Sequence, residues 1–136
     1  DRRSGRRPWE RQRIGNGELV TGIALNLLVL KTHDLESACR FYAALGFHFT
    51  AEQHGSGPVH HSAPMGNAII EIYPLPQDQP VDTTTRLGFS IADPDAVVKE
   101  IEGVRGRLLK AARQTPWGYV AIVADPDGRT IELHRA

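Results

Sequence analysis

The same order of secondary-structure signals occurs twice along the chain, and this repetition restricts the fold more than any other feature. In each half an apolar strand is followed by a capped helix and then by three more strands, an order written β-α-β-β-β. We expect module 1 over about residues 23–74 and module 2 over about residues 84–135. Because 136 residues can bury one substantial core, the modules should share it within a single α+β domain, residues 23–136.

The signals of module 1 begin with a strand over residues 25–30, which has apolar side chains on both faces. Asp34 predicts the start of a helix and Gly46 its end, because the apolar residues between them recur at helical spacing. A second strand begins at Phe47 and is broken by the turn-forming residues 54–58. Residues 59–63 and 68–73 then predict a hairpin.

Module 2 repeats these signals in the same order. Residues 87–91 alternate as in a strand, and Asp93 and Pro94 begin a helix that we expect to end at Gly103. Residues 107–112, 119–124 and 130–134 predict three more strands. The last two are joined by Asp-Pro-Asp-Gly at residues 125–128, which has the preferences of a type I turn.

Composition excludes several classes of partner. Lys+Arg and Asp+Glu both number 16, so no overall charge favours nucleic acid or an anionic membrane. No apolar run approaches the roughly 20 residues that span a bilayer, and the first residues lack the apolar segment of a signal peptide. Cys39 is the only cysteine, which excludes an intramolecular disulfide and suits a reducing compartment. We therefore expect a cytoplasmic protein without a specific nucleic-acid or membrane partner.

Residues 1–22 are predicted to form an extension, because they are rich in arginine and glycine and lack an apolar period. We interpret them as a mobile arm or a leader, and packing of Trp9 against a partner subunit is the alternative. A nucleic-acid arm is weakly supported, because arginines alone attract phosphate without specificity.

Several segments resemble the glyoxalase/bleomycin-resistance/extradiol-dioxygenase proteins, the vicinal oxygen chelate superfamily. Residues 34–47 resemble the family's "DLERS…FY…LGF" helix, residues 70–72 the last strand of its first module, and residues 125–133 its closing "DPDG…IEL" hairpin. The likeness covers residues 25–135. It implies a curved mixed sheet that forms a cup, a small molecule bound in that cup, and a homodimer.

The resemblance also implies a metal site. In metal-dependent members, the first and last strands of each module together hold a divalent cation in the cup. Strand alternation points Glu71 and Glu132 into the cup, because their apolar neighbours in sequence should face the helices. Tyr73 and His134 share the faces of these two glutamates.

The other two ligand positions depart from the family pattern. Asn26 stands where the family has His, Gln or Glu, and Arg86, inward with Ser90, stands at the matching place in module 2. Asparagine is a poor neutral ligand, and arginine repels a divalent cation. We therefore hypothesise that the Arg86 guanidinium replaces the cation and lies between Glu71 and Glu132. A purely stabilising ion pair, with no ligand in the cup, is the alternative.

The histidines leave a second metal set open. His60 and His61 point to opposite faces of one strand, so at most one of them enters the cup. With Glu71, Glu132 and His134 it would suit zinc, nickel or iron. The candidate site residues are Glu71, Arg86 and Glu132 for catalysis, Glu71 and Glu132 for a metal, and Asn26, His61, Tyr73, Ser90, Trp117 and His134 for ligand binding.

These residues suggest three functions. The first is a binding or resistance protein that holds a planar or cationic compound without a cofactor, since half of the metal set is missing. The alternative is a lyase, isomerase or dioxygenase that uses a divalent metal, or that uses Glu71, Glu132 and Arg86 directly as base and oxyanion stabiliser. The third is an interaction module whose cup has lost its ligand.

Overall fold

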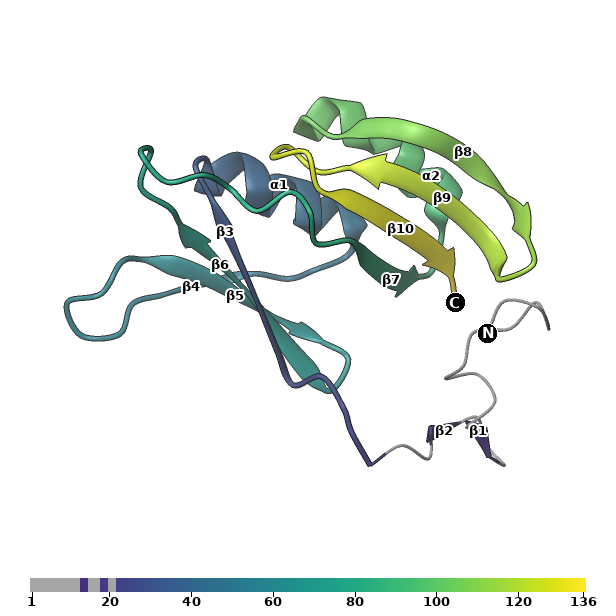
Figure 1. The fold of residues 1–136 in the computed structure, drawn as a ribbon, viewed down its shortest axis with the longest axis horizontal. Coiled ribbons are helices and arrows are strands. Elements are labelled where there is room, and N and C mark those ends of the chain that lie inside the picture. The colour runs from purple at the N-terminus through teal and green to yellow at the C-terminus, as the bar shows by residue number, and fades with distance from the viewer. Residues whose placement is uncertain (1–12, 15–17, 20–21) are drawn as a thin grey trace.

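The computed structural model describes residues 13–14, 18–19 and 22–136, and it contains the predicted β-α-β-β-β order twice (Figure 1). Module 1 comprises β3 (Leu27–Thr32), α1 (Leu35–Leu45), β4 (Thr50–Glu52), β5 (His60–Met65) and β6 (Ala68–Pro74). Module 2 comprises β7 (Leu87–Ile91), α2 (Pro94–Glu100), the 3-10 helix η2 (Ile101–Val104), β8 (Arg107–Thr115), β9 (Gly118–Ala124) and β10 (Thr130–Arg135). Among the described helices, none has the length and apolar character that crossing a bilayer requires.

Two short strands precede module 1. They are β1 (Arg13–Ile14) and β2 (Glu18–Leu19), and they pair with each other in antiparallel fashion. The remainder of the expected extension, including Trp9, for which packing against a partner subunit was the alternative, lies outside the described residues.

The predicted helix starts are confirmed in both modules. The Asp34 carboxylate accepts a hydrogen bond from the Ser37 amide at 3.1 Å, and the Asp93 carboxylate accepts one from the Ala96 amide at 3.2 Å. The predicted end at Gly103 is wrong. The chain continues from α2 into η2, which keeps Ile101 in the core, and the left-handed residue that follows is Arg105, with φ 64°.

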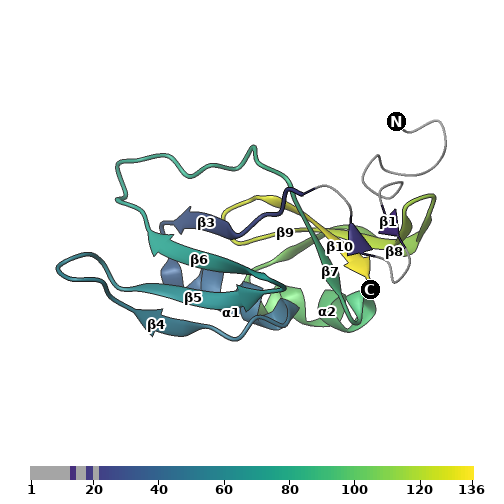
Figure 2. The same cartoon turned by 90° about the horizontal axis from the view of Figure 1, so that it is seen from below.

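Each module forms its own four-stranded sheet, in the order β3-β6-β5-β4 and β7-β10-β9-β8. The first strand pairs in parallel with the last, and the other neighbours are antiparallel. Both first strands are therefore edge strands, and in the described part of the chain no ladder joins β3 to β7. Helices α1 and α2 lie close together on one side of the two sheets, as the view from below shows (Figure 2).

One apolar core serves both modules. Its buried members are Leu30, Ala38, Phe41, Tyr42, Leu45, Ala63, Ile70, Ile72, Val97, Ile101, Ala121, Val123, Ile131 and Leu133. Gly106 allows the turn after η2 to approach α1 closely, because a Cβ atom at this position would lie 2.6 Å from Cε1 of Phe41. The outer face of each sheet, away from the helices, is left for other contacts.

A buried polar network joins the last hairpin of module 2 to module 1. The Tyr42 hydroxyl donates to Asp125 Oδ2 at 2.7 Å, and Arg129 Nη1 donates to the same oxygen at 3.1 Å. Nη2 of Arg129 donates to the Lys31 carbonyl at 2.6 Å. Burial and the charge of Asp125 raise the pKa of Tyr42 well above its usual value. The predicted turn is closed by a hydrogen bond from the Gly128 amide to the Asp125 carbonyl at 2.9 Å.

Candidate functional site

Alternation along β10 places Glu132 and His134 on the outer face of the second sheet. Their neighbours in sequence, Ile131 and Leu133, are fully buried on the opposite face, against the helices. The parallel register of β10 with β7 sets Glu132 beside Gly88 and His134 beside Ser90. This part of the predicted cup face is therefore present.

The Glu132 carboxylate is held from two sides. Arg86 Nε lies 2.9 Å from Glu132 Oε2, and His134 Nε2 lies 2.8 Å from Glu132 Oε1. The Arg86 side chain is 54% exposed and that of Glu132 is 18% exposed, so the pair borders solvent. A guanidinium fixed on this carboxylate occupies the direction from which a divalent cation would approach.

A pocket of about 300 Å³ opens over this pair on the second sheet. It is lined by Arg86, Lys110, Arg113, Thr115, Trp117, Val120, Ile122 and Glu132. Three of these side chains are cationic and one is anionic, so the pocket attracts negatively charged groups. We call it the Arg86 pocket.

The sequence did not reveal Lys110 and Arg113 as members of this pocket. They are three residues apart on β8, a spacing that regular alternation assigns to opposite faces. Two register shifts along the β8–β9 ladder instead set Lys110 opposite Ile122 and Arg113 opposite Val120. Such shifts are the effect of β-bulges, and they bring both cations to the face of Glu132.

Glu71 lies on the other sheet. It pairs in register with Val29 of β3 and Ser62 of β5, and its Oε2 lies 3.7 Å from Nε2 of His60. The structure thus brings Arg86 to Glu132 but does not place Arg86 between Glu71 and Glu132. The second expected metal set is divided in the same way, with His60 beside Glu71 and His134 beside Glu132.

Two predicted ligand-binding residues lie on a different face from the one expected. His61 pairs in register with the buried Ile72, so His61 faces the helix side and His60 takes the outer face. Asn26 lies just before β3 and, by alternation, shares the helix-side face of Leu28 and Leu30. Its backbone carbonyl accepts a hydrogen bond from the Ile69 amide at 3.1 Å. The outer position next to it is therefore occupied by Leu27, which cannot bind a metal.

Tyr73 keeps its predicted place on the outer face of the first sheet. Its ring is stacked on the His60 imidazole with 4.1 Å between ring centroids. Burial first, and then the charges of Glu71 and Glu52, raise the pKa of the Tyr73 hydroxyl. Tyr73 is thus part of a polar cluster that is separate from the Arg86 pocket.

These positions do not fit the four-ligand cation site that the family resemblance implies. One position on β3 carries the apolar Leu27, and the matching position of module 2 carries Arg86, whose guanidinium is already paired with Glu132. Only two of the four positions offer carboxylates. No chemical step is therefore assigned to a cation at that place.

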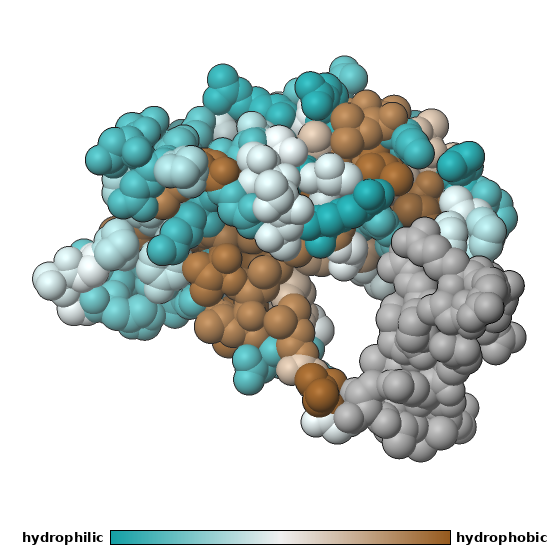
Figure 3. Space-filling model, in the orientation of Figure 1, coloured by the Kyte–Doolittle hydropathy of each residue, from teal (hydrophilic) through white to brown (hydrophobic). Residues whose placement is uncertain are grey.

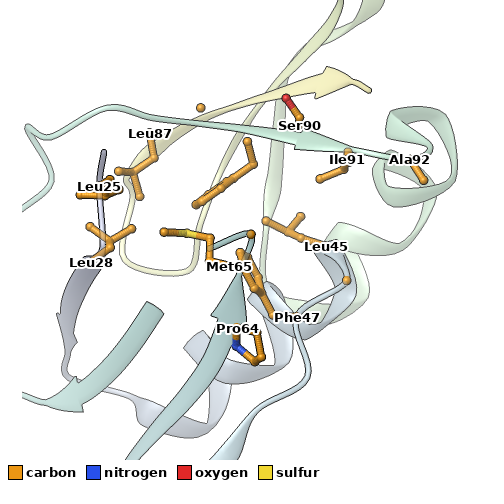
Figure 4. A pocket seen from close by; sticks show the side chains of 14 residues that line it. Leu25, Leu28, Leu45, Phe47, Pro64, Met65, Leu87, Ser90, Ile91 and Ala92 are labelled. Carbon is orange, nitrogen blue, oxygen red and sulfur yellow. The ribbon is translucent and has the colours of Figure 1, made fainter. Parts of the chain in front are cut away.

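An apolar groove of about 630 Å³ lies between the two modules (Figure 4). Leu25, Leu28, Met65 and Leu87 face one another across it, and it continues along β7 past Ser90. Apolar side chains also lie exposed around the β3 edge, where Figure 3 shows a hydrophobic surface. The groove offers few polar groups that could orient a ligand, whereas the Arg86 pocket offers several.

Comparison with known proteins agrees with the fold and the motifs. The family model of the Glyoxalase/Bleomycin resistance protein/Dioxygenase superfamily matches residues 24–133. An uncharacterized protein of Mycolicibacterium smegmatis (strain ATCC 700084 / mc(2)155) is 30% identical over 110 residues, which cover 81% of this chain and 91% of that protein.

The solved structures that are similar over most of the chain include the following two. TnmS3, an antibiotic binding protein from Streptomyces sp. CB03234, is 26% identical with a TM-score of 0.63, and the match covers 83% of this chain and 95% of that chain. A hypothetical protein from S. aureus is 16% identical with a TM-score of 0.66, covering 85% of this chain and 99% of that chain. At this low identity, the second likeness concerns the fold alone.

Proposed function

Because the chain belongs to the Glyoxalase/Bleomycin resistance protein/Dioxygenase superfamily, and carries an arginine where metal-dependent relatives hold a cation, we propose that it binds a small organic molecule in the Arg86 pocket without a metal at that pocket. The observation that carries this proposal is the 2.9 Å ion pair between Arg86 and Glu132. In this pair the Arg86 guanidinium neutralises the Glu132 carboxylate, so no metal ion is needed to balance the charge of Glu132.

The Arg86 pocket favours a ligand with an acidic group and an apolar or aromatic part. Lys110 and Arg113 add positive charge that Glu132 alone does not balance. Trp117, Val120 and the neighbouring aliphatic surface of β9 offer an apolar wall. Because of this excess of positive charge, we expect an anionic ligand rather than the planar or cationic compound that the resemblance suggested. The likeness to TnmS3, an antibiotic binding protein, supports a binding role.

A matched set of compounds tests this proposal. Aromatic carboxylic acids and their neutral amides would be compared by thermal shift, with and without EDTA. We expect the acids to raise the melting temperature, the amides to have little effect, and EDTA to change neither result. A chelator that abolishes the acid's effect would contradict metal-free binding.

Arg86→Gln locates the binding site. Losing a charge-assisted hydrogen bond of about 1.5–3 kcal/mol should weaken binding of the acid roughly 10- to 100-fold. Arg105→Gln is the matched control, because Arg105 pairs with Asp34 at 3.1 Å and is absent from the Arg86 pocket. Equal affinity of the Arg86→Gln and Arg105→Gln variants would place the ligand elsewhere.

A second candidate function is a metal-free enzyme, and the contact of His134 with Glu132 at 2.8 Å favours it. An imidazole beside a carboxylate can transfer a proton to or from a bound substrate, with Arg86 stabilising a negative charge. A nucleophilic cysteine has no place in this scheme, because burial raises the pKa of the Cys39 thiol to about 11. Turnover of a bound acid that His134→Gln removes, with binding retained, would favour the enzyme.

We also propose that two copies form a homodimer, as the family resemblance implies. The open edges of β3 and β7 and the exposed apolar residues around β3 support pairing. Light scattering of the purified full chain measures the oligomeric state directly.

A further inference from the structure

His60, on the first sheet, has a buried ring nitrogen, Nε2, that lacks a hydrogen-bond partner among the described residues. The side chain is only 1% exposed. The nearest acidic oxygens are Glu71 Oε2 at 3.7 Å and Glu52 Oε1 at 3.9 Å, both beyond hydrogen-bond distance. Buried polar atoms are nearly always paired, so this exception needs an explanation.

Protonation of the ring does not remove the difficulty. Nδ1 lies 3.3 Å from the Pro58 carbonyl oxygen, and since a carbonyl only accepts, Nδ1 carries a proton. In the neutral ring, Nε2 then presents a lone pair toward two carboxylates. In the charged ring, the Nε2 proton has no acceptor in reach. A ligating histidine that donates its other ring nitrogen to a backbone carbonyl is a common arrangement at metal sites.

Further ligands surround the same atom. One possible ligand atom from each of Glu52, His54 and His60 lies within 4.8 Å of the other two. The hairpin loop between β4 and β5 holds His54 in place, because its carbonyl accepts the Gly57 amide at 3.0 Å and Gln53 Nε2 donates to the Gly57 carbonyl at 2.9 Å.

We propose that Glu52, His54, His60 and Glu71 bind a divalent transition-metal ion on the outer face of the first sheet. Imidazole and carboxylate ligands together suit Zn²⁺, Fe²⁺ and Ni²⁺. Zinc binds such atoms at about 2.0–2.2 Å, which puts neighbouring ligand atoms of a tetrahedral site about 3.3 Å apart. The observed distances from His60 Nε2, 3.7 Å to Glu71 and 3.9 Å to Glu52, slightly exceed that value, and small rotations of both glutamate side chains would shorten them to it.

This site differs from the cation site that the family resemblance implies. Three of its four ligands come from β4, β5 and the loop between them, and none comes from module 2. It is also independent of the proposed ligand pocket, which lies on the other sheet. The stacked Tyr73 ring fixes the plane of the His60 imidazole and leaves its Nε2 edge directed at the two carboxylates.

Titration calorimetry with Zn²⁺ alone, on the full chain stripped of metal, tests the proposal. We expect one ion per chain. His54→Ala and Glu52→Gln should each weaken binding at least about tenfold, because even the partners behind direct ligands contribute that much. Both side chains reach solvent, so neither variant should unfold the protein. With Co²⁺ in place of Zn²⁺, a visible absorption band should appear in the wild type and weaken in both variants.

Two histidine variants serve as controls. His61→Ala removes the neighbouring imidazole on the opposite face of β5, and His134→Gln removes the one beside Glu132. Both should bind Zn²⁺ with wild-type affinity and stoichiometry. Wild-type affinity in the His54→Ala and Glu52→Gln variants, or loss of binding in His134→Gln alone, would overturn the proposal.

Discussion

Replacing Arg129 by methionine would remove the one cation of the buried network between the modules. Methionine preserves much of the apolar stem, so the change isolates the guanidinium. Arg129 donates to Asp125 Oδ2 at 3.1 Å, to Asp127 Oδ2 at 3.2 Å and to the Lys31 carbonyl at 2.6 Å. None of these contacts can be remade by a thioether.

The expected loss of stability follows from burial. The side chain of Arg129 is 2% exposed and that of Asp125 is 0% exposed, so the variant leaves a carboxylate without water or a counter-ion. Removing one partner of such a pair destabilises a protein by about 3–5 kcal/mol. At about 4 °C for each kcal/mol, the melting temperature should fall by roughly 10–20 °C.

Urea unfolding followed by circular dichroism measures this loss. The matched control is Arg105→Met, because Arg105 pairs with Asp34 at 3.1 Å with both side chains largely exposed. Such a surface pair is worth at most about 1 kcal/mol. Adding Asp125→Asn to Arg129→Met should recover part of the lost stability, since it removes the unpaired charge.

Equal destabilisation by Arg129→Met and Arg105→Met would refute this reasoning. So would a double variant with Asp125→Asn that is less stable than Arg129→Met alone. In either case the network would hold the modules together by packing rather than by compensation of charge.

Three further predictions concern the core and the oligomer. Gly106→Ala should lower the free energy of unfolding by about 1–3 kcal/mol, because the added methyl group would overpack against α1. Gly103→Ala is the control and should have no such effect, because no atom lies within 4 Å of a Cβ at that position. Urea unfolding measures both. Stability should fall as pH rises above about 10, because a tyrosine whose pKa is raised by folding ionises more readily when unfolded; in a pH series of unfolding curves, Tyr42→Phe should reduce this dependence. Val29→Lys on the exposed β3 edge should convert the proposed dimer to a monomer in light scattering.

Local signals predicted the elements well because their causes lie within a few residues. The caps at Asp34 and Asp93 and the turn at residues 125–128 form where side chains reach nearby amides. The end of α2 was predicted wrongly because Gly103 is a local stop signal, whereas the observed end depends on the burial of Ile101 in the core, which is a tertiary effect. Contacts made at long range decided that boundary, and no local pattern contains them.

The candidate site was less predictable. The pairing of Arg86 with Glu132 could be predicted because Arg86 immediately precedes β7, which proved adjacent to the strand β10 that carries Glu132. That Glu71 lies beside His60 rather than sharing Arg86 with Glu132 could not be predicted, because it depends on how the two sheets are placed by the packing of α1 against η2. The choice of His60 over His61 required the register of β5, and a one-residue slip reverses every side chain of a strand.

The buried network also determines what would happen if the chain were cut between β6 and β7. One fragment would carry Tyr42 and the Lys31 carbonyl, and the other would carry Asp125 and Arg129. Each fragment would then hold polar groups whose partners were on the other, together with half of the shared apolar core. Neither should fold by itself, and the two should fold on mixing, which would make this small protein a natural system for fragment complementation.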